Sequence, residues 1–160
     1  MIPDYKFFHG AVLADIVDRH RQPVSFREVV DQGRLLNYVL NDAIGLHLRY
    51  STKRLRPWGF SFLDAHLDQL RELVGSYPAS FVVLVCNNDG FVAIDASQLL
   101  KSIVNRIGDQ YWFRVDRKKR EMYRVFGPSG EFPMRFRTTS EPIVEALEIA
   151  EQCRATIARL

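Results

Sequence analysis

Apolar side chains recur at helical spacing in four stretches of the chain. A period of three to four residues places the apolar positions on one face of a helix, where the fold can bury them. The spacing predicts helices over residues 7–21, 61–76, 97–107 and 141–159. Ser61 is followed three residues later by Asp64, which is the spacing of a capping box and predicts where the second helix begins.

Shorter apolar runs bounded by turn residues predict strands. The runs 35–40 and 44–50 flank Asn41 and Asp42, which suit a tight turn. The segment 24–31 fits either a short strand or a helix. The other predicted strands are 81–86 with 91–94, 111–115 with 122–126, and an edge strand over 132–137, where Pro133 lacks a ladder donor.

The order of these elements predicts an α+β (mixed α/β) fold. We expect a central, mostly antiparallel or mixed β-sheet with flanking helices and a long C-terminal helix. The chain has 160 residues, of which 47% are hydrophobic and 26% charged, and this composition is typical of one globular domain over residues 1–160.

Several features of the sequence indicate a cytoplasmic protein. The apolar runs are shorter than a bilayer crossing requires, and the N-terminus lacks the charged start and apolar core of a signal peptide. The two cysteines, Cys86 and Cys153, do not suggest a disulfide framework. We therefore expect a protein with no membrane partner.

Basic and aromatic residues gather in two places along the chain, and the net charge is +3. The first group lies between a predicted strand and a predicted helix and contains Arg49, Lys53, Arg54, Arg56 and Trp58. The second lies at the tip of the hairpin 111–126 and contains Arg117, Lys118, Lys119 and Arg120. Cations can neutralise phosphates and aromatic rings can stack on bases, so together the groups predict nucleic-acid binding. Solvated charges that keep a turn soluble are the alternative explanation.

Residues 24–100 resemble the PD-(D/E)xK nuclease fold in element order and in a few residues. In that family an acid starts one strand, and the next strand carries Glu/Asp-x-Lys. The two acids hold Mg²⁺, and the lysine positions or activates the attacking water. Asp42 matches the first acid, whereas His47 stands at the second acid and Arg49 at the lysine.

This resemblance implies a degenerate site with no cofactor, because Mg²⁺ prefers oxygen ligands and arginine does not lose its proton. Glu28 is a remote candidate for the missing carboxylate, and Asp42 can instead close a hairpin as an Asx turn. The segment 50–54, with Pro57 and Trp58, also resembles a bacterial protein family to which no activity can be attached.

Three functions therefore remain open from the sequence. The first is nucleic-acid binding, by a nuclease-like fold that no longer cleaves. The second is a metal-dependent phosphodiesterase that uses Mg²⁺ with Asp42, Glu28 and His47 as catalytic residues. The third is a self-associating module, a homodimer whose contact is formed by Trp58, Phe60, Tyr111, Trp112 and Phe113. No Walker, GxGxxG, HExxH or GxSxG motif is present, so nucleotide-cofactor and zinc-protease activities have no support.

Overall fold

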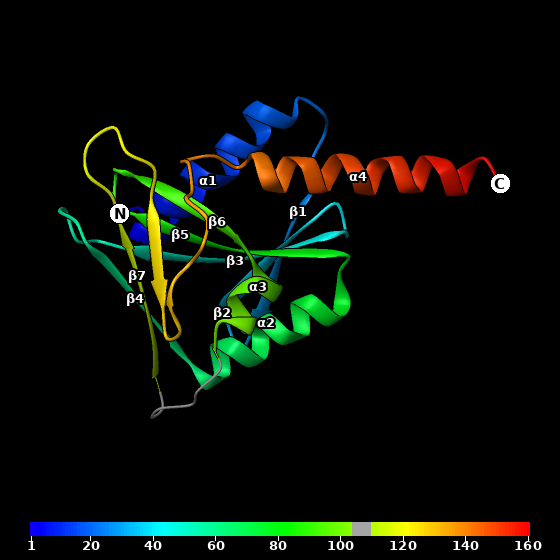
Figure 1. The fold of residues 1–160 in the computed structure, drawn as a ribbon. Coiled ribbons are helices and arrows are strands. Elements are labelled where there is room, and N and C mark those ends of the chain that lie inside the picture. The colour runs from blue at the N-terminus through cyan, green and yellow to red at the C-terminus, as the bar shows by residue number, and fades with distance from the viewer. Residues whose placement is uncertain (104–109) are drawn as a thin grey trace.

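A mixed five-stranded sheet forms the centre of the fold (Figure 1). The computed structural model describes residues 1–103 and 110–160. The strand order is β1 (Phe26–Asp31), β2 (Arg34–Leu40), β3 (Ile44–Ser51), β5 (Ala79–Cys86) and β6 (Gly90–Asp95). β3 and β5 are parallel, and the other neighbours are antiparallel. The ambiguous segment 24–31 thus contains a strand, and the two predicted hairpins β2–β3 and β5–β6 are confirmed.

An antiparallel second sheet contains β4 (Trp58–Leu63), β7 (Gln110–Asp116), β8 (Arg124–Gly127) and β9 (Gly130–Glu131). In β4 the side chains of Trp58, Phe60 and Phe62 are buried in alternation, which is the period of a strand. The prediction that Ser61 caps a helix was therefore wrong. Ser61 lies within β4, and α2 (Asp64–Ser76) begins only after that strand ends.

The helices divide between the two faces of the five-stranded sheet (Figure 1). α1 (Asp4–His20) and α4 (Glu141–Ala158) pack on one face, where Val12, Ile16 and Leu147 enter a shared core. α2 and α3 (Ala96–Lys101) pack on the other face, together with the buried side of the second sheet. Both faces of the sheet are therefore covered, which agrees with the long apolar runs of its inner strands.

The remaining predictions differ from the structure mainly at the ends of elements. The segment 132–137 does not form an edge strand, and Phe136 makes an isolated bridge with Tyr123. α3 ends at Lys101, and the part of its predicted helix over 104–109 lies outside the described residues. The α+β fold class is confirmed, as is the long C-terminal helix, whose second half extends beyond the sheet (Figure 1). None of the helices among the described residues combines the length and the apolar character needed to cross a bilayer.

Candidate functional site

The two basic segments predicted from the sequence lie next to each other. Arg56, in the loop between β3 and β4, donates from Nε and Nη2 to the two carboxylate oxygens of Asp116, at 2.6 and 2.8 Å. Asp116 is the last residue of β7, so this bidentate pair ties the loop to the hairpin β7–β8. The hydrogen bonds from Arg56 hold the pKa of Asp116 below its usual range.

The exposed side of the second sheet combines aromatic rings with cations. We call this surface the outer face and define it by Lys53, Gly59, Trp112, Arg114 and Phe126, which line a hollow of about 480 Å³. Trp112 is 61% exposed, because it alternates along β7 with the buried Phe113. The guanidinium carbon of Arg114 lies 4.3 Å from the centroid of the Phe126 ring.

The absence of a side chain at Gly59 and the cations Lys53 and Arg114 both bear on how an anionic ligand can approach the outer face. Gly59 lies opposite Arg114 and beside the Trp112 ring, with which a Cβ atom at position 59 would make an ordinary van der Waals contact at 3.8 Å. Lys53 donates from Nζ to the Pro57 carbonyl at 2.9 Å. In the described part of the chain, neither Lys53 nor Arg114 forms an ion pair with a carboxylate. The hollow therefore places two cations that form no ion pair with any described residue beside an open indole ring, although the charge of Arg114 also acts at longer range on Asp116, whose pKa it helps to lower.

The residues predicted to contact nucleic acid differ from one another in exposure and in hydrogen-bond partners. Trp58 is 3% exposed and donates its indole N–H to the Lys53 carbonyl at 2.9 Å, so its ring offers no surface to a base. Arg56 is held by Asp116, and Arg117 donates from Nε to Asp89 at 2.8 Å. Among the other cations of the two groups Arg49 is half-buried, and the exposed ones are Lys53, Arg54, Lys118, Lys119 and Arg120.

The aromatic contact predicted for a homodimer is mostly inside the protein. Trp58, Phe60, Tyr111 and Phe113 are all buried, and of the five predicted rings Trp112 alone is exposed. The sequence 111–113 is apolar at three successive positions, so its pattern could not show which side of the strand faces outward. Trp112 and Phe126 therefore entered no predicted nucleic-acid site.

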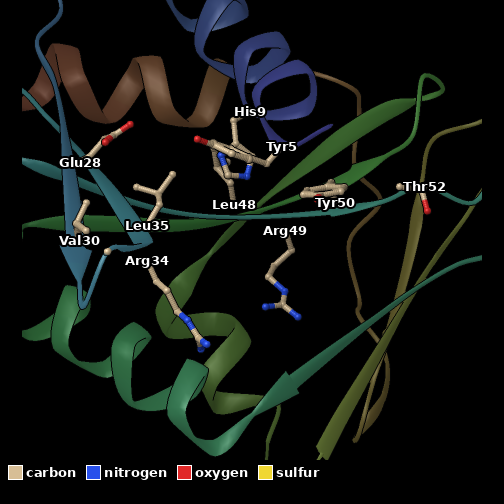
Figure 2. A pocket seen from close by; sticks show the side chains of 11 residues that line it. Tyr5, His9, Glu28, Val30, Arg34, Leu35, Leu48, Arg49, Tyr50 and Thr52 are labelled. Carbon is tan, nitrogen blue, oxygen red and sulfur yellow. The ribbon is translucent and has the colours of Figure 1, made fainter. Parts of the chain in front are cut away.

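A second hollow lies where two neighbouring strands separate. β2 pairs with β3 only from Tyr38 to Leu40, although β2 begins at Arg34 and β3 continues to Ser51. We call the space between the separated halves of these strands the fork. It contains a cleft of about 870 Å³ (Figure 2), lined by Tyr5, His9, Glu28, Val30, Gly33, Arg34, Leu35, Leu48, Arg49, Tyr50 and Thr52.

Arg49 belongs to the fork and not to the outer face. Its Nη2 donates to the Ser61 carbonyl at 2.5 Å, and its Nη1 lies 3.2 Å from Nε2 of His66. The guanidinium carbon also lies 5.3 Å from the centroid of the Phe62 ring. Burial lowers the pKa of Arg49 from its ordinary value, because the charged form is partly removed from water.

His47 is a buried neutral imidazole next to the fork. The side chain is 3% exposed, and burial, aided by the charge of Arg49, lowers its pKa to about 3. The neutral ring donates its Nδ1–H to Oδ1 of Asn37 at 2.8 Å. Its Nε2 atom is then an acceptor, and it has no hydrogen-bond partner among the described residues.

The three predicted catalytic residues do not come together. Glu28 pairs with Tyr38, whose side chain packs in the core beneath α1, whereas His47 faces the opposite side of the sheet toward Phe62. Asp42 is exposed at the turn between β2 and β3, and it pairs with Arg27 at 3.6 Å.

These positions do not match the oxygen-rich ligand set that Mg²⁺ requires. Among the described residues no group of three or more His, Cys, Asp or Glu side chains is placed to hold a metal ion. The outer face and the fork are therefore the two candidate binding sites. Comparisons with protein-family models, with curated proteins and with solved structures found no match to this chain.

Proposed function

We propose that this protein binds single-stranded nucleic acid on the outer face. The main observation behind the proposal is the exposed ring of Trp112, which lines one hollow with Lys53 and Arg114, two cations that form no ion pair in the described part of the chain. Proteins that bind single strands combine such a ring, on which a base stacks, with cations that follow the phosphates.

The geometry of the sheet favours a single strand over a duplex. Trp112 stands on the open face of β7, where an unpaired base can lie against its ring, whereas the bases of a duplex are already stacked on each other. Arg114 lies over Phe126 and presents a flat cationic surface next to the indole. Phosphates of the same strand can then reach Lys53, and the exposed Arg54 extends the positive surface along the loop.

The proposal includes a degenerate relation to the PD-(D/E)xK nucleases. Support for this part of the proposal comes from the antiparallel strands β1 to β3, with α2 and the parallel strand β5 later in the chain, although β4 of the second sheet lies between β3 and α2. A buried neutral His47 at the position of the family's second acid favours binding without metal-dependent cleavage. Cleavage in the presence of Mg²⁺ that is lost in Asp42→Ala would instead favour the hydrolytic alternative.

Fluorescence anisotropy with labelled strands of about 12 nucleotides tests the proposal. We expect single-stranded DNA or RNA to bind more tightly than duplex of the same sequence. Trp112→Ala should weaken single-strand binding roughly 5- to 150-fold, because stacking on an aromatic ring contributes about 1–3 kcal/mol per base. Ile157→Ala is the matched control, since Ile157 is an equally exposed apolar residue on α4. Equal affinities of Trp112→Ala and Ile157→Ala would refute the proposed site.

A further inference from the structure

Two arginines line the same side of the fork without a carboxylate partner. Figure 2 shows the side chains of Arg34 and Arg49 extending toward the side of the sheet that α2 covers. In the described part of the chain neither guanidinium forms an ion pair. Glu28 is the one carboxylate among the lining residues, and it lies on the opposite side, toward α1. The α2 side of the fork is therefore electropositive.

A register shift in the sheet directs Arg34 to that side. Val29 pairs with Asn37 but Val30 pairs with Leu35, so Leu36 is an extra residue in β2. Such a bulge reverses the alternation of side chains beyond it. Leu35 consequently packs toward the core under α1, and Arg34 points toward Arg49 on the other face. With regular pairing Arg34 would share the face of Tyr38 instead.

The hydrogen bonds of His66 leave two donors facing each other. Nδ1 of His66 accepts from the backbone N–H of Leu63 at 3.0 Å, because a backbone amide can only donate. Because Nδ1 accepts this hydrogen bond it carries no proton, so the proton of the ring is on Nε2. Burial and the neighbouring Arg49 lower the pKa of His66, which favours this neutral form. Nη1 of Arg49, which is also a donor, lies 3.2 Å from this Nε2 atom. An anionic oxygen held beside both groups would accept from each of them.

His47 differs from Arg49 and His66, because its Nε2 atom lacks a hydrogen-bond donor among the described residues, whereas Nη1 of Arg49 and Nε2 of His66 are both donors. His47 and Arg49 are two residues apart on β3 and share a face, and the rings of His47 and His66 have centroids 6.1 Å apart. Nε2 of His47 is a buried acceptor that needs a donor. A phosphate monoester beside two guanidinium groups is a dianion, which offers acceptor oxygens and no O–H donor. His47 does not line the cleft, so it is not one of the proposed contacts.

We propose that the fork binds a small phosphate monoester, with Arg34, Arg49 and His66 as donors to its oxygens. Two guanidinium groups match the charge of a phosphate, and charge-assisted hydrogen bonds of this kind are strong. The volume of the cleft falls in the range of small-molecule sites. Leu35, Leu48 and Tyr50 line the same cleft on its α1 side, so the organic part of the ligand would extend through the fork toward α1. This site is separate from the outer face and does not rest on it.

Isothermal titration calorimetry with adenosine 5′-monophosphate tests the proposal, with adenosine as the control that lacks the phosphate. We expect heat of binding with the monophosphate but not with adenosine, and we expect inorganic phosphate to compete. Arg34→Ala should weaken binding about 10- to 100-fold, the size typical of a hydrogen bond to a charged group. Arg34 is exposed, and its side chain forms no hydrogen bond or ion pair among the described residues, so this variant should fold even if Arg49→Ala does not.

Arg71→Ala is the matched control, because Arg71 is an exposed arginine on α2 whose partner is Asp68. Nitrogen-15 NMR of the imidazole rings should show the Nε2 resonance of His66 shifting when phosphate is added. The proposal is overturned if neither phosphate nor the monophosphate moves that resonance, or if Arg34→Ala binds as tightly as Arg71→Ala. It is also overturned if binding is lost in Trp112→Ala and kept in Arg34→Ala, which would place the nucleotide on the outer face.

Discussion

The outer face and the fork both join arginines to aromatic rings, but they differ in burial. On the outer face Trp112 and Lys53 are open to solvent, and they stand on one side of a sheet with no wall around them. In the fork Arg49 is half-buried between β3 and β4, and a separation of two strands forms the cleft around it. An open surface suits a long polymer that makes many weak contacts, whereas an enclosed cleft suits a small ligand with a few directed hydrogen bonds.

The two tryptophans should give the largest contrast, and the measurement is stability. Trp58→Ala should lower the free energy of unfolding by about 3–5 kcal/mol, because it removes a large ring from the core. Trp112→Ala should change it by no more than about 0.5 kcal/mol, since most of that ring is already in water. Urea unfolding of both variants gives the comparison. Similar losses in the two would mean that Trp112 is a structural residue and not an open binding surface.

The second effect is the contribution of His47, beside the fork, to the pH dependence of the free energy of unfolding. The pKa of His47 is about 3 in the folded protein, against an ordinary 6.5 when the chain unfolds. Below pH 6.5 the unfolded chain takes up a proton that the folded chain takes up only near pH 3. This one group should therefore lower the free energy of unfolding as pH falls through that window, by up to about 1.4 kcal/mol per pH unit.

His47→Gln isolates this contribution, because glutamine does not titrate and can still donate to Asn37. His9 and His66 have lowered pKa values as well, and their effect has the same sign and is present in both proteins. Urea unfolding at several pH values should thus give a shallower slope for the variant than for the wild type. Parallel slopes would mean that His47 is not held neutral by burial.

The salt dependence of binding should show the smallest of these effects, and it should differ between the outer face and the fork. Each phosphate contact to a single strand contributes about 0.7 to the slope of log affinity against log salt concentration. Lys53→Ala should lower that slope by about this amount in anisotropy titrations. Binding of a phosphate monoester in the half-buried fork should depend less on salt, because partly buried charges are screened less. An unchanged slope in Lys53→Ala would remove this lysine from the nucleic-acid contact.

The sequence predicted elements well where turn chemistry and apolar period agree. The hairpin β5–β6 is an example, since two apolar runs flank a turn that contains Asn87 and Gly90, both with positive φ. The predicted start of α2 was wrong. Ser61 and Asp64 have the spacing of a capping box, but the aromatic rings of β4 alternate as in a strand. The helix start is stabilised instead by His66, which accepts from the Leu63 amide.

The two sites were harder to predict because each depends on how strands are placed in space. Arg49 and Lys53 are four residues apart and form one basic group in the sequence, yet the structure divides them between the fork and the outer face. The direction of Arg34 depends on one extra residue in β2, and no local pattern marks that bulge. Trp112 was recognised as an aromatic residue, but its exposure depends on which side of β7 the core covers.

The most direct test of this account measures two ligands against two variants. Trp112→Ala and Arg34→Ala should each be titrated with a single-stranded oligonucleotide and with adenosine 5′-monophosphate. We expect Trp112→Ala to lose affinity for the oligonucleotide and to keep its affinity for the monophosphate. We expect Arg34→Ala to lose affinity for the monophosphate and to keep most of its affinity for the oligonucleotide. If Trp112→Ala retains the wild-type affinity for the single strand, nucleic-acid binding on the outer face is contradicted.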